Sequence, residues 1–224
     1  MVTTIDYPLS PGGVTYALLD ANVLLPPRLS DIVFDLFSQG MFKARWSECI
    51  EQEFVRNWPK VVANVKPGLS TESLAEERKK AKRRLSCYQG AVREYEIFGY
   101  DNDEVSSRVP AAVDAGDKHV AAASLVLLDY AENANDKVFI LSNNLKHLAV
   151  ADMKALGVAV IRPGPFIDLL THVAPERVGA ALDQSITSLS KPPYTRRMLL
   201  EVLRLHGAVI TANHFEQAWR ADLD

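Results

Sequence analysis

Three short apolar segments constrain the fold of this chain more than any other feature of its sequence. Residues 16–20 are YALLD, residues 137–142 are KVFILS and residues 158–163 are VAVIRP. Continuous apolar runs such as the last two are typical of strands inside a parallel sheet. Helical patterns separate the three runs. This alternation of strands and helices predicts an α/β domain with three α/β/α layers and a mainly parallel sheet.

The intervals between these strands carry the start and stop signals of helices. Ser30 and Ser47 are suited to cap two helices, and Gly40 is suited to end the first of them. The expected elements are a strand over residues 41–46 and helices over residues 30–40, from Ser47 through Trp58, over about 70–98 and over 117–130. A break is expected at Pro67–Gly68, and residues 99–116 are expected to be irregular.

The last part of the chain has helical patterns only. Helices are predicted over residues 176–189 and 196–205, separated by Ser190–Pro193, and a third is predicted after Thr211. The expected organisation is therefore a domain at residues 14–172 and a C-terminal helical region at residues 173–224.

Composition and charge exclude several classes of protein. The chain has 224 residues, with 25 Lys and Arg against 28 Asp and Glu, so its formal net charge is −3 and any surface that binds nucleic acid must be local. The apolar stretch near Val120–Leu128 is too short to span a membrane, and the first residues lack a secretory signal. Cys49 and Cys87 cannot form a disulfide framework, and no CxxC motif is present. We therefore expect a reduced, cytoplasmic protein that does not associate with membranes.

Polar side chains follow the predicted strands at their carboxyl ends. Asp20 ends the first strand, and Asn144 lies just beyond the strand that ends at Ser142. Asp114 and Asp117 directly precede the Ala-rich helix. Because ligands of parallel sheets collect outside the carboxyl ends of the strands, these side chains could converge. Carboxylate oxygens suit Mg²⁺ or Mn²⁺, and no His/Cys cluster is present for a softer metal.

Each of these acids also has an ordinary structural explanation. Asp20 could form an Asx-turn, and Asp117 could simply cap its helix. Glu48, Glu51 and Glu53, which follow Trp46, could form a solvated helix face. The prediction of a metal site therefore depends on the whole set of acids.

Four segments, in this order, resemble the successive motifs of PIN-domain proteins. They are LLDANVLLPPRLSDIVFDLF (18–37), ARWSECIEQEFVRNW (44–58), VDAGDKHVAAAS (113–124) and FILSNNLKHL (139–148). The likeness is greatest to the larger stand-alone bacterial PIN proteins related to VapC-type toxins, and it runs from about Ala17 to Phe166. The segment SKPPYTRRMLLEVLRLHG (190–207) resembles the tail of that subfamily.

The resemblance implies a three-layer α/β/α fold and a metal-dependent endoribonuclease. The catalytic acids of the PIN family match Asp20, Glu53 and Asp117 of this chain. The resemblance further implies that Asp114 joins these three acids as a ligand of Mg²⁺ or Mn²⁺. Such an ion would activate water and neutralise charge on the leaving oxygen. The supporting polar residues, which could also serve only in turns, are Asn22, Ser142 and Asn144.

Two departures from the family pattern lower the negative charge of the predicted site. Many PIN proteins have Asp at the position of Asn144, and an acid is often found where this chain has His147. The helical pattern also leaves Glu51 as an alternative to Glu53, because Glu51 lies nearer the centre of the apolar stripe. His119 is interpreted as a packing or capping residue.

Six basic residues between Arg78 and Arg84 lie in one predicted helix. As an RNA-binding surface this run would use Lys79, Lys80, Arg83 and Arg84, and otherwise it would be a solvated helix face. The RNA could be tRNA, rRNA or mRNA. The resemblance to VapC-type toxins further implies a cognate antitoxin and a PIN homodimer.

Two other functions are compatible with parts of the sequence. One is a PIN-like domain that binds RNA or a protein without cutting, which the substitutions at Asn144 and His147 favour. The other is a haloacid-dehalogenase-like phosphatase, because VFILSNN resembles a phosphate-binding motif of that family. Asn22 argues against the phosphatase, since it stands where that family needs a second, proton-transferring Asp.

Overall fold

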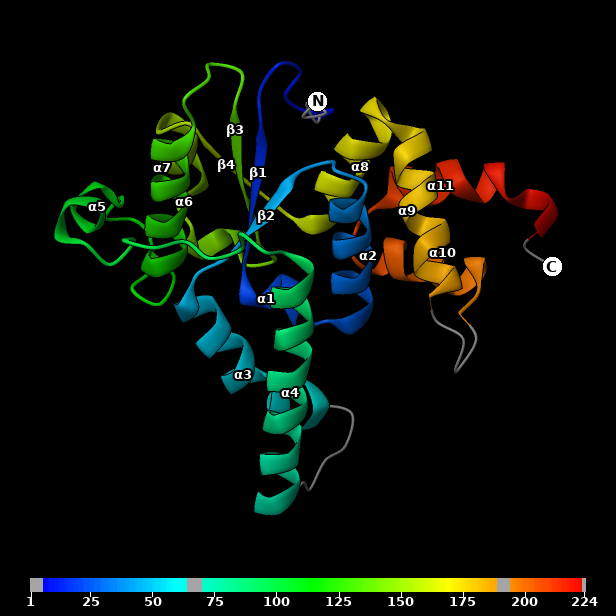
Figure 1. Cartoon of the computed structure of the whole chain (residues 1–224), viewed down its shortest axis with the longest axis horizontal. Helices are drawn as coiled ribbons and strands as arrows, with labels where there is room; N and C mark the ends of the chain where they lie inside the picture. The colour runs from blue at the N-terminus through cyan, green and yellow to red at the C-terminus, as the bar shows by residue number, and fades with distance from the viewer. Residues whose placement is uncertain (1–5, 64–69, 189–193, 223–224) are drawn as a thin grey trace.

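A sheet of four parallel strands forms the centre of the computed structural model, which describes residues 6–63, 70–188 and 194–222 (Figure 1). The strand order is β2-β1-β3-β4, with β1 at Thr15–Leu19, β2 at Lys43–Arg45, β3 at Lys137–Leu141 and β4 at Val158–Ile161. Leu18 pairs with Arg45 on one side and with Ile140 on the other. The all-parallel sheet confirms the expected α/β class.

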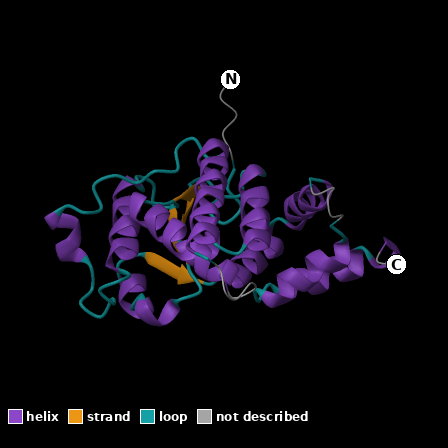
Figure 2. Cartoon of the chain, turned by 90° about the horizontal axis from the view of Figure 1, so that it is seen from below, coloured by secondary structure: helices purple, strands orange, loops and turns teal. Residues whose placement is uncertain are grey.

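Helices cover both faces of the sheet. On one face α6 (Lys118–Tyr130) contacts β1, β3 and β4, with α7 (Val150–Ala155) beside it. On the other face α2 (Pro27–Ser38) and α8 (Pro163–Val173) pack, and the Phe166 ring of α8 lies 5.2 Å from the ring of Phe139 in β3. The view from below shows the strands enclosed among helices (Figure 2). The predicted α/β/α layers are therefore confirmed.

Helix α2 begins three residues before the cap that the sequence predicted. Pro26 is the N-cap and Pro27 the first helical residue, because the fixed φ of proline suits the first turn and needs no N–H partner there. The buried hydroxyl of Ser30 instead bonds to the Pro27 carbonyl and to the Tyr88 hydroxyl, at 3.0 and 2.7 Å. Gly40 follows the helix with a φ of +67°, as expected at a helix end.

Helices α3 (Glu48–Ala63) and α4 (Thr71–Ala91) pack side by side and project from the carboxyl edge of the sheet (Figure 1). Ser47 directly precedes α3, but its hydroxyl is buried and has no hydrogen-bond partner in the described part of the chain, so the predicted side-chain cap is wrong. The predicted break at Pro67–Gly68 lies outside the described residues.

Helix α4 stops at Ala91, seven residues short of its predicted end. The chain then runs along the edge of the sheet, where the Trp46 amide donates to Tyr95 at 2.8 Å and the Ile97 amide donates to Trp46 at 3.1 Å. The Tyr95 ring stacks on the Trp46 ring with centroids 4.6 Å apart. These contacts outweigh the helical pattern of the sequence and shield the exposed edge of β2.

Several short helices occur where none was predicted. Residues 99–116 contain α5 at Asp103–Arg108, and further short additions are α1 (Ala21–Leu24), the 3₁₀ helix η1 (Leu145–His147) and α7. The longer helix α8 was not predicted either. Helix α1 follows β1, and η1 follows β3 after three residues, so both lie at the carboxyl edge of the sheet.

The described part of the C-terminal region is helical, as the sequence predicts. It comprises α9 (Pro175–Thr187), α10 (Arg196–Leu205), α11 (Val209–Ala218) and the 3₁₀ helix η2 (Arg220–Asp222), whereas the predicted separator at Ser190–Pro193 lies outside the described residues. Helix α9 packs on α2, and α11 packs on α8. The Asp168 carboxylate of α8 accepts from the Thr211 amide at 2.8 Å.

One glycine sets how closely α8 approaches the C-terminal helices. A Cβ atom at Gly164 would overlap with the His206 carbonyl oxygen and would lie 2.6 Å from the Ala208 backbone nitrogen. Only a residue without a side chain allows this approach. The C-terminal helices therefore share one hydrophobic core with the α/β layers.

No described helix is long and apolar enough to cross a membrane. Cys49 and Cys87 are both free thiols.

Candidate active site

Asp20 lies at the carboxyl end of β1 and is only 2% exposed. Its Oδ2 atom accepts hydrogen bonds from Ser142 Oγ at 2.6 Å and from Asn22 Nδ2 at 2.5 Å. Ser142 follows β3, the strand that pairs with β1, so the parallel register brings these two strand ends together. The Asx-turn explanation of Asp20 does not account for these partners, because its carboxylate bonds to the neighbouring strand end.

Asn22, Asn143 and Asn144 fix the backbone around Ser142. The Asn22 side-chain oxygen accepts from the Asn143 amide at 2.8 Å, and the Asn144 amide donates to Ser142 Oγ at 2.9 Å. The Asn143 side chain also donates to the Asn22 carbonyl at 3.2 Å. Asn143 was not expected to take part. Its position directly after the third strand and Ser142 is the signal that could have identified it.

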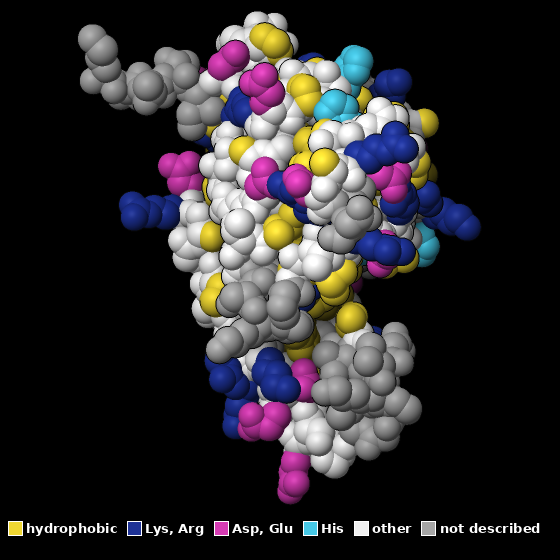
Figure 3. All heavy atoms as spheres, turned by 90° about the vertical axis from the view of Figure 1, so that its right-hand side faces the viewer, with side chains coloured by type: hydrophobic (Ala, Val, Ile, Leu, Met, Phe, Trp, Pro, Cys, Tyr) yellow, Lys and Arg dark blue, Asp and Glu magenta, His cyan; other side chains and the backbone are white. Residues whose placement is uncertain are grey.

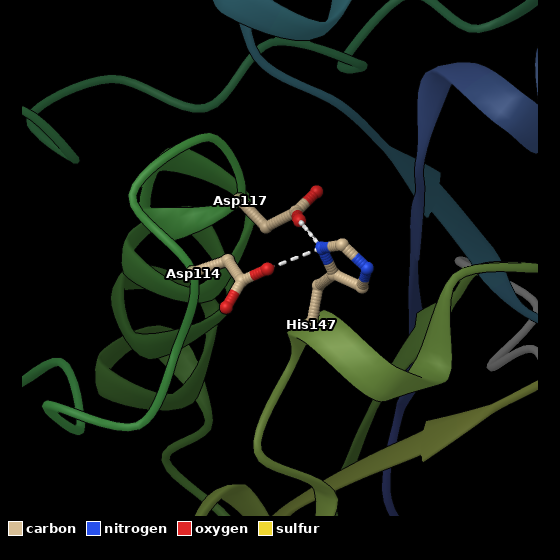
Figure 4. Close-up of side chains that lie close together, drawn as sticks. All are labelled: Asp114, Asp117 and His147. Atoms are coloured by element: carbon tan, nitrogen blue, oxygen red, sulfur yellow. Dashed lines mark ion pairs between the residues drawn. The ribbon is translucent and has the colours of Figure 1, made fainter.

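A second group of ligand atoms lies beside the start of α6. Asp114, Asp117 and His147 each offer one ligand atom, and these atoms all lie within 4.8 Å of one another (Figure 4). His147 Nδ1 forms an ion pair with Asp114 and lies 3.5 Å from Asp117 Oδ2. The amide of Asp114 donates to the His147 carbonyl at 3.0 Å, which holds η1 against the loop before α6.

Asp117 occupies the N-cap position of α6, yet its side chain makes no capping hydrogen bond. Its backbone carbonyl accepts from the amides of Val120 and Ala121 at 3.0 and 3.2 Å. The carboxylate is therefore turned to His147 rather than used by the helix. A simple capping role does not explain the direction of this side chain.

The two candidate glutamates of α3 have different surroundings. Glu53 lies 3.8 Å from His119 Nε2 and accepts from the Asn57 side chain at 3.2 Å. Glu51 instead accepts from Trp46 Nε1 at 2.9 Å and from Gln89 at 2.8 Å. The glutamate that faces the other acids is Glu53.

His119 contacts the site more directly than a packing residue would. Its Nε2 atom is buried without a hydrogen-bond partner in the described part of the chain, and Glu53 is the acid nearest to it. His119 lies two residues after Asp117, and the positive charge of its imidazole lowers the pKa of that carboxyl group.

Crowded carboxylates raise each other's pKa. Burial raises the pKa of Asp20 to about 6, and the negative charges of Glu53 and Asp117 add to the rise, while the Ser142 hydrogen bond opposes it. Burial also raises the pKa of Asp117, against the opposing effects of His147 and His119. Within the described ranges no Lys or Arg forms an ion pair with Asp20, Glu53, Asp114 or Asp117. A divalent cation would therefore relieve this repulsion.

The structure groups the acids differently from the expected catalytic set. Asp117 belongs to the close group with Asp114 and His147, whereas Asp20 and Glu53 lie outside it. Asp20 and Glu53 still act on each other electrostatically, and so do Asp20 and Asp117. His147, whose presence was expected to weaken the site, provides an imidazole nitrogen in the closest group. The Asn144 side chain makes no hydrogen bond to any described residue.

Three of the four expected RNA-binding residues on α4 already have acidic partners. Lys79 pairs with Glu76 at 2.7 Å and Lys80 with Glu77 at 2.6 Å. Arg84 is partly buried, pairs with Asp31 and donates to the Tyr88 hydroxyl at 2.5 Å. Figure 3 shows the same mixture of basic and acidic side chains on the lower part of the molecule. Arg83 is exposed and has no side-chain partner in the described part of the chain.

Comparison of the chain with protein-family models, with curated proteins and with solved structures found no match.

Proposed function

We propose that this protein is a divalent-metal-dependent endoribonuclease that resembles PIN-domain enzymes and hydrolyses RNA phosphodiester bonds. The observation that carries the proposal is the close group of Asp114, Asp117 and His147 at the carboxyl edge of a parallel sheet, with Asp20 and Glu53 near enough to act on it electrostatically and no Lys or Arg paired with any of these acids in the described residues. A fold that holds like charges together in this way is poised to bind a cation.

Asp114, Asp117 and His147 would hold the ion. Carboxylates accept either Mg²⁺ or Mn²⁺, and the imidazole nitrogen of His147 favours Mn²⁺. When bound, the ion would supply a water of lowered pKa and neutralise charge on the leaving oxygen. The metal donors come from the loop before α6 and from η1, so they depend on the backbone hydrogen bond between Asp114 and His147.

The remaining residues would position the substrate and its attacking water. Ser142 and Asn22 orient the Asp20 carboxylate through their hydrogen bonds. Burial raises the pKa of Asp20, which would favour its acting as the group that accepts a proton from the attacking water. Asn57, which donates to Glu53 at 3.2 Å, would keep that carboxylate oriented, with His119 Nε2 3.8 Å away from it.

The biological setting of this proposal rests on the resemblance alone. We infer a cytoplasmic RNA target, an antitoxin that docks near the acidic edge through a basic side chain, and a PIN homodimer. Expression of the wild-type chain without a partner should then slow growth, and Asp20→Asn should relieve the effect. Harmless overexpression of an active nuclease would instead indicate a role in RNA processing.

A cleavage assay on structured RNA tests the enzymatic proposal. Cleavage should require added Mn²⁺ or Mg²⁺ and should stop in excess chelator. Glu53→Gln should lose activity, and Glu51→Gln is the matched control because Glu51 lies on the same helix and bonds to Trp46 and Gln89 instead. Activity that persists in chelator, or equal loss in both variants, would contradict the proposal.

A second candidate is a PIN-like domain that binds RNA or a protein without cutting. Its support is the pairing of His147 with Asp114 and Asp117, which offsets part of the negative charge without a metal. RNA binding that persists without cations, together with no cleavage under any of them, would favour it. The phosphatase has less support, because Asn22 donates to Asp20 and cannot serve as the second acid.

A further inference from the structure

A groove between α3 and α4 combines an apolar floor with unpaired cations. Its volume is about 440 Å³, and Val55 and Leu85 line it together with Arg56, Arg78 and Lys82. Small-ligand pockets span roughly 300–1,000 Å³, so the groove is large enough for a short segment of one nucleic-acid strand. The two helices that line the groove project below the sheet in Figure 1.

The basic residues of α4 divide into two sets. Lys79, Lys80 and Arg84 are bound to Glu76, Glu77 and Asp31, respectively. Arg78 and Lys82 are one helical turn apart and both line the groove. Both are exposed, and neither side chain has an ion pair or hydrogen bond with any residue that the structure describes. The same holds for Arg56, which faces them from α3.

The two glutamates in the groove do not cancel these cations directly. Glu51 accepts from Trp46 and Gln89, and Glu48 accepts from the Gln52 side chain at 3.1 Å. Only one oxygen of each glutamate has these neutral donors, and neither glutamate forms an ion pair with a groove cation in the described part of the chain. The three cations outnumber the two carboxylates, so the lining keeps an excess of positive charge. This charge distribution suits a flexible polyanion whose phosphates can follow the positive side of the groove.

The groove is also next to the candidate active site. Arg56 is three residues after Glu53 on α3, so the two side chains are neighbours on the helix surface. We propose that the groove binds the backbone of single-stranded RNA, with Arg56, Arg78 and Lys82 contacting phosphates. This proposal rests on the proposed function only in taking RNA as the ligand and in placing its scissile bond beside Glu53.

Two double variants of α4 test the groove directly. Arg78→Gln with Lys82→Gln removes two of the three groove cations, and Lys79→Gln with Arg83→Gln removes one lysine and one arginine at the same spacing outside the groove. Binding of fluorescent oligo(U) is measured against salt concentration in excess chelator. Because no metal is present, the result does not depend on whether the protein cleaves RNA.

Removing one phosphate-binding cation should lower the salt slope by about 0.7 for single-stranded RNA. For the variant Arg78→Gln with Lys82→Gln, the slope of log affinity against log salt should therefore be lower by about 1.4. If the lines for this variant and the wild type meet near 1 M salt, the variant should bind about 25-fold more weakly at 0.1 M. Adding Arg56→Gln on α3 should increase the loss of slope to about 2 and the loss of affinity at 0.1 M salt to about 100-fold. The control variant should keep the wild-type slope.

Three results would overturn the proposal. They are equal losses in the groove and control variants, no loss in either, and failure of the wild-type chain to bind oligo(U). A fluorescent oligoglutamate of matched charge is measured in parallel. If it binds through Arg78 and Lys82 while oligo(U) does not, the groove belongs to an acidic protein partner instead. Unchanged urea midpoints verify that each variant is folded.

Discussion

The acidic edge of the sheet and the basic helix α4 both concentrate one kind of charge, but the structure balances them differently. At the edge, the pKa values of Asp20 and Asp117 are raised, and only His147 and His119 offer opposite charge among the described residues. On α4, Lys79 and Lys80 each pair with a glutamate three residues earlier. The acids are thus only partly compensated, by histidines, where the chain segments meet, while several of the cations are neutralised within their own helix.

This difference shows that charge density along the sequence is a poor guide to binding. The edge becomes a candidate site because separate segments bring their carboxylates together and, among the described residues, only histidines and no Lys or Arg pair with them. Helix α4 has more charge in fewer residues, yet only the cations without partners are available to a ligand. The predictions below test the two halves of this contrast, beginning with the largest expected effect.

Asp20→Asn should abolish cleavage while making the protein more stable. Loss of the carboxylate should lower activity by at least about 100-fold, the cost typical of removing one preorganised catalytic group. The unfolding free energy at pH 7 should rise by about 1–3 kcal/mol, because the buried charge is removed and the amide oxygen can still accept from Ser142. RNA cleavage and urea unfolding measure the two effects. Lower stability in the variant would show that Asp20 is mainly structural.

The stability of the metal-free protein should fall as pH rises. The pKa of Asp20 is about 6 in the folded state against an ordinary value of 3.8, so the folded protein holds an additional proton between these values. The protonated Asp20 therefore adds about 3 kcal/mol to the unfolding free energy. This added stability is fully present below about pH 4 and is lost as pH rises through about 6. The raised pKa of Asp117 acts in the same direction.

Urea unfolding in chelator between about pH 4 and pH 7 measures this dependence. The difference between the wild type and Asp20→Asn isolates the contribution of Asp20 from all other titrating groups. A difference that does not change with pH would contradict the assignment of a raised pKa.

Mn²⁺ should stabilise the folded protein through the group that contains His147. At a free concentration about 100 times the Kd, binding adds about 2.7 kcal/mol, which for a chain of this size corresponds to a rise in Tm of about 5–10 °C. His147→Ala should reduce the shift for Mn²⁺ more than for Mg²⁺, because the nitrogen ligand is lost. Thermal unfolding monitored by circular dichroism measures both shifts, and equal shifts in the variant and the wild type would exclude His147 as a ligand.

Arg84→Gln and Lys79→Gln should separate structural from solvated cations on α4. Arg84 joins Asp31, Tyr88 and the Pro27 carbonyl, so its loss should cost about 1–3 kcal/mol of unfolding free energy. Lys79 forms an exposed pair, and its loss should cost no more than about 0.5 kcal/mol. Urea unfolding compares the two, and neither should change oligo(U) affinity by itself. A marked loss of affinity in Lys79→Gln would restore it as an RNA contact.

The sheet and its main helices could be predicted because their signals are local. The apolar runs at β1, β3 and β4 specify buried strands, the continuous apolar stretch of α6 specifies a buried helix, and the hydrophobic spacing of α10 specifies its buried face. The end of α4 could not be predicted, because it depends on contacts between Tyr95 and Trp46, which are far apart in the chain. The start of α2 was missed because Ser30 resembles a cap, although the proline pair determines where the helix begins.

The candidate site was only partly visible in the sequence for a similar reason. The positions of Asp20, Asp114 and Asp117 follow from the ends of strands and helices, so their presence at one edge could be anticipated. The choice between Glu51 and Glu53 could not, because it depends on which of them Trp46 and Gln89 engage. The pairing of Arg84 with Asp31, 53 residues away, likewise depends on how α4 packs on α2.

The close approach of Gly164 to the turn between α10 and α11 limits which residues position 164 can accept during evolution. Any larger residue there would push against the backbone of the turn between α10 and α11, whereas Gly90 and Gly116 have no atom within 4 Å of the position where a Cβ would lie. A library of random variants selected only for folding should therefore keep glycine at position 164 and lose it freely at the other two. Retention of glycine at position 164 would thus identify, from sequences alone, the contact that makes the α/β layers and the C-terminal helices depend on each other.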